Sequence, residues 1–482
     1  MTFVPLLGVL AVMLLKRENV GAIRWTATFF SFVPLVASIF LLTDYNWSTA
    51  AIQFIERYEW FPQVNITYFM GADGLSIPML FLTALLSFVS IIASFNIKER
   101  VKEYFAWFLL LEVGMMGVFC ALDFFLFYVF WEIMLVPMYF LIGVWGGPRR
   151  EYAAIKFFLY TLFGSLFMLV GILALYFTTG TLDMMELIGK NSIYSHTFQL
   201  WVFAAFFVGF AIKVPVFPFH TWLPDAHVEA PTAVSVILAG VLLKMGTYGL
   251  LRVSFPMFPQ AAKYYSIPIA ILGMIGIIYG ALVSMAQKDL KKLVAYSSVS
   301  HMGYCMLGMA ALTTVGISGC IFQMFSHGVI TGALFLLVGV LYDRAHTREI
   351  AAFGGLGAKL PLYTGIFTLF AMASLGLPGM SGFVSEFMVF VGSFNSTYIP
   401  TWIVILSVLG VILTAGYILR MIQKMFLGQF NTKWESLTEI NGREVFTVVP
   451  LALFTLLVGC YPESLNVFLR ATVENLVTII TR

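Results

Sequence analysis

Charged residues are scarce in this sequence. They make up only 11% of its 482 residues, and Lys and Arg exceed Asp and Glu by three. A soluble domain has roughly 25% charged residues, so this chain cannot cover a soluble surface, and a soluble enzyme is excluded. Disorder is excluded because disordered chains are polar. The nearly neutral balance gives no sign of nucleic-acid binding.

Cysteine is also scarce. The four cysteines, at 120, 305, 320 and 460, are scattered through apolar stretches, and no two have CxxC spacing. An iron–sulfur or zinc site is therefore not expected. The glycine-rich segment 354–359 lacks the spacing of a phosphate-binding loop. His220 and His227 stand seven residues apart across Pro224 without further ligands nearby, so no metal site is predicted.

What the sequence has in abundance is apolar residues, at 60% hydrophobic with 48 Phe, and a mean hydropathy of +0.94. A helix that crosses a bilayer needs about 20 mostly apolar residues. The predicted fold is an all-α polytopic membrane protein with about fourteen transmembrane helices. An outer loop at 44–74 connects the second helix to the third and has room for a hairpin. The expected spans are 2–16, 22–43, 75–97, 104–121, 124–146, 153–178, 198–221, 230–251, 266–286, 293–311, 316–342, 361–384, 400–427 and 446–466.

Basic residues set the expected orientation. If the loop after the first span faces the cytoplasm, nineteen Lys and Arg residues lie on that side, and six lie opposite. The six are Arg57, Lys190, Arg252, Lys263, Arg470 and Arg482. The excess of cytoplasmic positive charge predicts that both termini lie on the outer side, which is the periplasm in a bacterium.

Seven ionisable residues fall inside the predicted spans. Each costs about 3 kcal/mol or more at a helix centre unless it is paired or hydrated. Seven of them predict a hydrated polar path through the bundle rather than a purely structural scaffold. They are Glu112, Glu132, Lys213, Lys244, His301, His327 and Glu386.

Lys213 lies just before Pro215 and Pro218. Proline removes a backbone donor and breaks a helix, and a break at membrane depth is tolerated beside a hydrated cavity. A lysine at such a break gains or loses a proton when its partner moves. We therefore expect Glu132 and Lys213 to form a switchable pair. Whether Glu112 lies on the path or pairs locally stays open.

A second group of helix breakers, at 375–382, precedes Glu386. Glu132 and His301 are 169 residues apart, and Lys213 and Glu386 are 173 apart. These offsets predict two inverted five-helix repeats, at 104–253 and 266–427, each with a broken helix. Residues 1–103 precede the repeats, and residues 428–482, with the last span, follow them. Such repeats are typical of transporters whose site lies at the midplane. His301 and His327 suit a proton relay because histidine titrates near neutral pH.

Several sequence blocks resemble a known family. The run KVPVFPFHTWLPDAHVEAP at 213–231 is similar to the signature of the proton-conducting, antiporter-like membrane subunits of respiratory complex I and of multisubunit Na+/H+ antiporters. Further similar blocks cover nearly the whole chain. They are MGADGLSIPM at 70–79, FWEIMLVPMYFLIGVWGGPRR at 130–150, AYSSVSHMG at 295–303 and SLGLPGMSGF at 374–383.

Within that family, a glutamate at the position of Glu386 resembles the M-type, or chain 4, subunits, whereas N-type and antiporter subunits carry lysine there. The L-type is disfavoured because its long C-terminal extension is not found here. The resemblance implies that Glu132 and Lys213 form the modulating pair and that Lys244 is the central proton carrier. It places His301 and His327 on the hydrated axis and makes Glu386 the exit-side carrier.

The resemblance also implies the wider setting. The chain would be a proton-translocating membrane-arm subunit of an NADH:quinone oxidoreductase that binds no cofactor itself, with FMN, iron–sulfur clusters and quinone on partner subunits. The L-type and N-type subunits would flank it in a bacterial cytoplasmic membrane, or in a thylakoid if the source is photosynthetic. A subunit of a Na+/H+ antiporter is the alternative. The electron donor is left open, because its site would lie on other chains.

Overall fold

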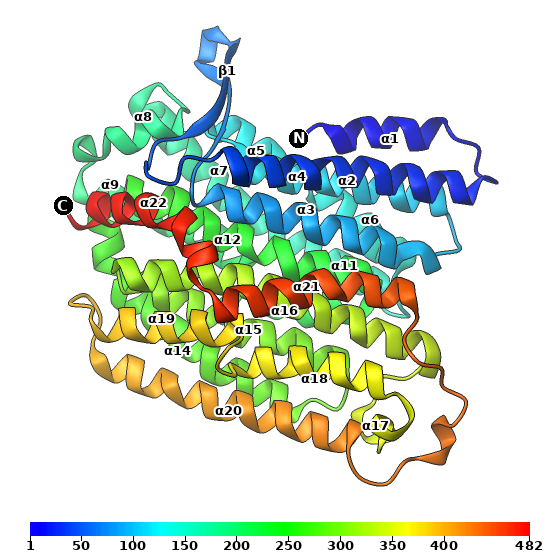
Figure 1. The fold of residues 1–482 in the computed structure, drawn as a ribbon. Helices are drawn as coiled ribbons and strands as arrows, with labels where there is room; N and C mark the ends of the chain where they lie inside the picture. The colour runs from blue at the N-terminus through cyan, green and yellow to red at the C-terminus, as the bar shows by residue number, and fades with distance from the viewer.

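The computed structural model describes residues 1–482, and helices running side by side make up most of it (Figure 1). Helices suit a membrane because all their backbone hydrogen bonds lie within the segment. Eleven are long and apolar enough to cross a bilayer. They are α2 (Val20–Asp44), Ser76–Asn96 with α3 (Ser76–Ala93), α4 (Val101–Cys120), Phe124–Trp145, α7 (Arg150–Thr179), α9 (His196–Lys213), Thr232–Met257, α14 (Pro259–Ala286), α16 (Thr314–Ala345), α20 (Thr401–Phe426) and α21 (Gly442–Cys460).

Two of these spans are divided within their length. Phe124–Trp145 consists of α5 (Phe124–Ile133) and α6 (Leu135–Trp145), which meet at Met134. Thr232–Met257 contains α11 (Thr232–Ile237), α12 (Leu243–Gly249) and α13 (Phe255–Met257). Between these three lie two π-helical turns, η4 (Leu238–Leu242) and η5 (Leu250–Ser254), so that α12 is flanked by wider turns on both sides.

Three of the fourteen predicted spans are not among these eleven helices. Segment 2–16 forms only α1 (Val4–Leu14), whose 11 residues extend about 16 Å, roughly half a hydrocarbon core. Segment 361–384 forms two short helices, α18 (Pro361–Leu375) and α19 (Ser381–Phe394). The helix α15 (Leu290–Ala310) is long enough, but it is not among the eleven because its serine and histidine residues make it less apolar than they are.

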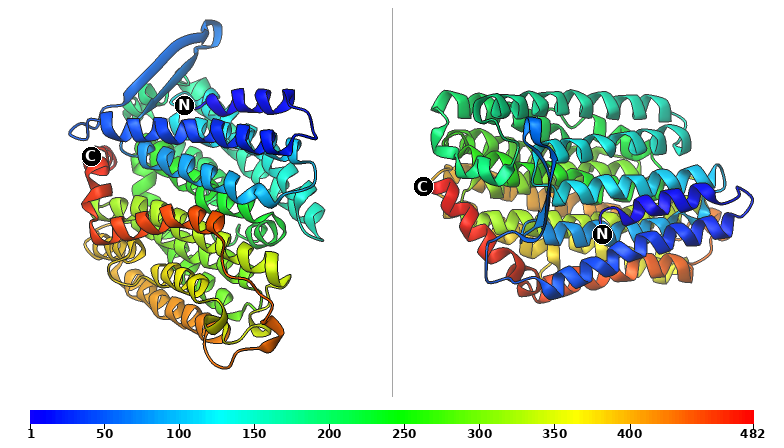
Figure 2. Two further views of the ribbon diagram at one scale, coloured as in Figure 1. Left: turned by 45° about the vertical axis from the view of Figure 1, so that its right-hand side comes forward. Right: turned by 90° about the horizontal axis from the view of Figure 1, so that it is seen from above.

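The predicted outer loop contains the expected hairpin. Strands β1 (Gln53–Phe61) and β2 (Ile66–Ala72) pair antiparallel and project from the helices (Figure 2). Two contacts tie the hairpin to the helices: the Thr67 backbone N–H donates to Asp123 at 3.1 Å, and Arg57 forms an ion pair with Asp183 at 2.7 Å.

The C-terminal region holds one helix more than predicted. The last predicted span, 446–466, corresponds to α21, which already ends at Cys460. After a short turn a separate helix, α22 (Glu463–Thr481), follows. The backbone N–H of Gly74 donates to Thr472 on α22 at 3.1 Å, so this helix lies against the start of α3. The short helices α8 (Met184–Gly189), α10 (Trp222–Glu229) and α17 (Leu356–Lys359) complete the α elements.

Both predicted helix breaks are present. Helix α9 ends at Lys213, and the chain passes Pro215 and Pro218 before α10 begins. The buried carbonyl of Ile212 accepts a hydrogen bond from Trp222 Nε1 at 2.9 Å. Helix α18 ends at Leu375, and the next residue, Gly376, has a φ of 84°, in the left-handed region that favours glycine.

Candidate functional site

Lys244 is the second residue of α12 and is fully buried. Its Nζ is 2.6 Å from Nδ1 of His327 on α16, and it donates to the Ala239 carbonyl at 2.5 Å. An ammonium has only donors, so His327 Nδ1 accepts, and its proton is then carried by Nε2. That second ring nitrogen is buried and has no hydrogen-bond partner within the protein.

Two further residues predicted from the sequence, His301 and Glu386, extend the series of buried side chains beyond His327. The rings of His327 and His301, on α16 and α15, have centroids 5.5 Å apart. His301 Nδ1 is 3.5 Å from a carboxylate oxygen of Glu386 on α19. The other ring nitrogen of His301 is 3.1 Å from the hydroxyl of Ser374 on α18. Lys244, His327, His301 and Glu386 thus form one buried chain across four helices.

Two polar residues of this cluster were missed by the sequence reasoning. Gln323 lies one helical turn before His327, and its Nε2 is 3.4 Å from His301 Nδ1. Its side-chain carbonyl accepts a hydrogen bond from Ser385, the residue before Glu386. The signal was a glutamine in an otherwise apolar stretch, four residues before a predicted histidine.

A small cavity lies among these side chains. Its volume is about 10 Å3, close to the room that one water needs. His301, Gln323, His327, Ser374 and Glu386 all line it. A water there would have several polar partners and would join His327 to the other groups.

Lys213 and Glu132 stand apart from this chain. Lys213 is buried at the end of α9, and no carboxylate lies within 4.0 Å of it. Its Nζ lies 3.5 Å from Met134 Sδ and stands over the rings of Trp131 and Phe157, at 5.6 and 5.3 Å from their centroids. Aromatic faces attract an ammonium, which gives Lys213 a partner other than an anion. The expected pair is therefore not in ionic contact here, although Glu132 lies on the adjoining helix α5.

The remaining ionisable candidates make no contact with the chain. Glu112 is fully buried on α4, and neither of its oxygens has a hydrogen-bond partner. His220 Nε2 is 3.3 Å from the Tyr279 hydroxyl, and His227 stacks on Phe335 with centroids 4.6 Å apart. No group of three His, Cys, Asp or Glu side chains is placed to hold a metal ion.

A buried ion pair was also missed. The sequence reasoning placed Asp73 and Arg252 in outer loops, but both are buried, and Arg252 Nη1 is 2.8 Å from Asp73 Oδ2. Arg252 Nε also donates to the Tyr248 hydroxyl at 3.1 Å. The signal was spacing, since Tyr248 and Arg252 follow Lys244 at intervals of four residues. Lys291, counted as a loop residue, is likewise buried and donates to the Ala230 carbonyl at 2.6 Å.

Comparisons with known families cover most of the chain. Residues 121–414 match the family "NADH:quinone oxidoreductase/Mrp antiporter, TM". Residues 1–122 match the family "NADH-ubiquinone oxidoreductase chain 4, amino terminus".

Full-length relatives agree with these matches. NADH-quinone oxidoreductase subunit M of Rickettsia prowazekii is 43% identical, covering 98% of this chain and 97% of the relative. The Rhodobacter capsulatus subunit M is 44% identical over 99% of this chain and 95% of its own. NADH-ubiquinone oxidoreductase chain 4 of Arabidopsis thaliana is 43% identical over 98% and 95%.

Solved structures give the same result for the fold. A chain of respiratory complex I from Thermus thermophilus superposes with a TM-score of 0.91 at 29% identity, covering 99% of this chain and 98% of that one. A chain of the Mrp complex from Dietzia superposes with a TM-score of 0.86 at 20% identity, over 100% and 99% of the two chains. The second likeness shows the fold alone. By its family matches and its full-length relatives, the chain belongs to the subunit M (chain 4) family of NADH:quinone oxidoreductase, respiratory complex I.

Proposed function

We propose that this chain translocates protons for a complex I-type NADH:quinone oxidoreductase along a path through Lys244, His327, His301 and Glu386. The observation that carries the path is the buried series from Lys244 Nζ to the Glu386 carboxylate, in which only the step between the neighbouring rings of His327 and His301 lacks a direct polar contact. In a structural bundle, buried polar groups of this cost would be replaced by apolar ones.

The chemistry needs only proton transfers. Protonated Lys244 donates to His327 Nδ1, and His327 releases its other proton from Nε2 toward a water in the small cavity. His301, which lies beside Gln323 and Ser374, takes up a proton from that water and passes its Nδ1 proton to the Glu386 carboxylate, which becomes neutral. The starting state returns when Lys244 is reprotonated from one side, Glu386 releases its proton on the other, and the proton left on His327 moves from Nδ1 back to Nε2.

Glu132 and Lys213 would control this path by changing their separation. With Glu132 beyond ionic contact, the positive charge of Lys213 acts on the interior, where charges interact strongly. If Glu132 approaches Lys213, the pair neutralises that charge, and Lys244 then holds its proton more easily. This pair would transmit coupling between neighbouring subunits, each switching between two arrangements.

The inverted repeats 104–253 and 266–427 belong to the same proposal. Two isolated β-bridges support them, Asp123 with Asp183 and Asp289 with Glu349, each joining residues 60 positions apart. Asp123 caps the N-terminus of α5, and Asp289 caps the N-terminus of α15. The two bridges therefore occupy equivalent places in the two repeats. The flanking segments 1–103 and 428–482 stand outside the repeats.

The setting of the chain follows from family membership and charge. The chain would lie in a bacterial cytoplasmic membrane, or in a thylakoid membrane if the source is photosynthetic. In the bacterial membrane both termini would lie on the periplasmic side, since most basic residues lie on the opposite side. The L-type and N-type subunits would flank the chain. FMN, iron–sulfur clusters and quinone would be held by partner subunits. The alternative, a Na+/H+ antiporter subunit, has in its favour the shared fold of the Mrp complex and a family match at 121–414 that covers both kinds of protein.

The test uses inverted membrane vesicles that contain the whole enzyme with wild-type chain or with Lys244→Ala. Lumen acidification and quinone reduction are followed together after NADH is added. We expect a clear fall in the acidification per quinone reduced, because the variant loses the share of protons that this chain carries. Equal acidification in both would reject Lys244 as the carrier.

A further inference from the structure

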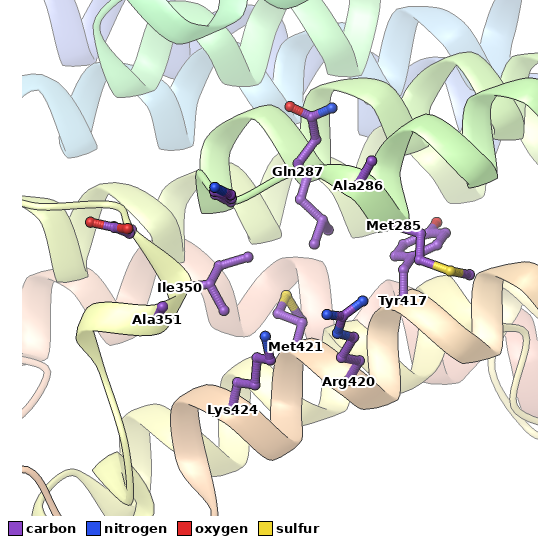
Figure 3. Close-up of a pocket in the computed structure, with 12 residues that line it drawn as sticks. Met285, Ala286, Gln287, Ile350, Ala351, Tyr417, Arg420, Met421 and Lys424 are labelled. Carbon is purple, nitrogen blue, oxygen red and sulfur yellow. The ribbon is translucent and has the colours of Figure 1, made fainter.

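A cleft of about 350 Å3 opens at the ends of α14 and α20, away from the proton path (Figure 3). Three basic side chains line it, Lys288 just after α14 and Arg420 and Lys424 on the last turns of α20. Figure 3 shows Arg420 and Lys424 rising from one helix toward the residues of the facing segments.

These three cations have no anionic partner. None of them forms an ion pair within 4.0 Å or a side-chain hydrogen bond, and Glu349 is the one carboxylate in the lining. Arg348, next to the lining residue Glu349, is neutralised by its ion pair with Asp289 at 3.2 Å. The cleft therefore keeps a surplus of two positive charges.

The rest of the lining is apolar. Met285, Leu293, Ile350, Tyr417 and Met421 form the wall between the cations and the helices. Helices α14 and α20 are both long enough to span a bilayer and both end here, so the cleft lies where hydrocarbon meets the polar region. A ligand that fits has an anionic head and an apolar body.

We propose that this cleft binds the phosphate group of an anionic phospholipid, with the acyl chains lying along the apolar wall. The planar guanidinium of Arg420 suits two phosphate oxygens, and Lys288 and Lys424 add point charges. Basic pockets at the ends of membrane helices bind such headgroups, and each nearby Lys or Arg contributes about fivefold in affinity. In the proposed orientation the cleft faces the cytoplasmic side, but the binding does not depend on the proton path.

The experiment uses the delipidated whole enzyme, exposed to phosphatidylglycerol or phosphatidylcholine and examined by native mass spectrometry. The test variant is R420Q/K424Q, and the matched control is K433Q/R443Q, which removes one exposed and one half-buried cation that do not line the cleft. We expect the test variant to bind phosphatidylglycerol roughly 25-fold more weakly, about fivefold for each cation removed, and to retain one lipid fewer. The control should bind as the wild type does, and phosphatidylcholine should be retained by neither.

A further arm separates the sources of phosphate. Inorganic phosphate in excess should leave the retained phosphatidylglycerol in place; its displacement would overturn the lipid assignment in favour of a free anion. Equal retention by the test and control variants would overturn the site itself. If R420Q/K424Q does not assemble, the single variant K424Q is used instead and is exposed to a photoactivatable phosphatidylglycerol. Labelling of a partner subunit instead of α20 would also reject the proposal.

Discussion

At the scale of single residues, His327 has two ring nitrogens with different surroundings. Nδ1 lies 2.6 Å from Lys244, while Nε2 is buried without a partner in the protein and borders the small cavity. A ring bonded in this way can accept a proton at one nitrogen while the other gives one up. In the proposed path, His327 is the residue through which protons leave Lys244.

Replacing His327 with Ala should break this step. We expect proton transfer through this chain to slow roughly a hundredfold, the scale of a lost acid–base group, because Lys244 then has no acceptor. Acidification per quinone reduced should fall by the share that this chain contributes. Parallel recording of vesicle acidification and quinone reduction measures the ratio. His346→Ala, an exposed histidine at the end of α16, is the control and should pump normally. Normal pumping in His327→Ala would remove the residue from the path.

Glu132→Gln tests the controlling pair. The amide cannot neutralise Lys213, so we expect nearly complete loss of coupled pumping in an enzyme that still assembles. Blue-native electrophoresis reports assembly, and the vesicle assay reports pumping. Glu151→Gln, on the neighbouring helix α7, is the matched control and should leave both unchanged. Full pumping by Glu132→Gln would sink the pair model.

The candidate residues could be found from sequence because a charge inside an apolar helix is costly and so stands out. That reasoning located Lys244, His301, His327 and Glu386, which the structure brings together. It could not find Gln323 or Ser385, since neutral polar residues carry little cost. It misplaced Arg252, because an arginine near a helix end resembles a loop residue until its buried partner Asp73 is seen.

At the scale of elements, the two helix interruptions position the ionisable groups. The break after α18 has glycines with positive φ at 376 and 379, and it places Glu386 on the second turn of α19. A Cβ at Gly376 would lie 3.1 Å from a carboxylate oxygen of Glu386. The glycine thus serves the backbone conformation and also leaves room for the carboxylate.

Gly376→Ala should therefore weaken both stability and pumping. A left-handed conformation costs a residue with a Cβ about 1–2 kcal/mol, and the methyl group would displace Glu386 from His301. We expect a lower thermal unfolding midpoint together with reduced acidification. Gly365→Ala, inside α18 with nothing within 4 Å of the added methyl group, should match or exceed wild-type stability. Equal midpoints in the two variants would show that the Gly376 conformation is not required.

Most elements could be predicted because long apolar runs dominate the sequence, and the prolines and glycines marked both breaks. Helix α22 was missed because Glu463, Arg470 and Glu474 lower its hydropathy, and its amphipathic character is that of a helix packed on one face only. The short α1 was predicted as a span because composition does not show where a helix begins.

At the scale of the whole molecule, the question is which ion the bundle moves. The shared fold with the Mrp complex leaves proton pumping and sodium exchange equally compatible with the architecture. Glu386 is the residue that the sequence reasoning used to separate them, and the structure places it at the end of the histidine chain.

Glu386→Lys should impair proton release without creating sodium transport. A lysine there places a positive charge beside His301 and opposes its protonation, so acidification should fall. Sodium uptake is followed with a radioactive tracer in the same vesicles, and Glu349→Lys, in the cleft at the far end of α15, is the control for adding positive charge. Sodium uptake gained by Glu386→Lys would make this position a selectivity switch.

The most direct test of the account is the number of protons pumped per quinone reduced by the whole enzyme with Lys244→Ala. Inverted vesicles that receive NADH report both quantities in one cuvette. The account predicts a clear fall in this ratio, because the lysine that feeds His327 is gone. An unchanged ratio, with the assembled enzyme still reducing quinone, would contradict the claim that protons cross this chain through Lys244.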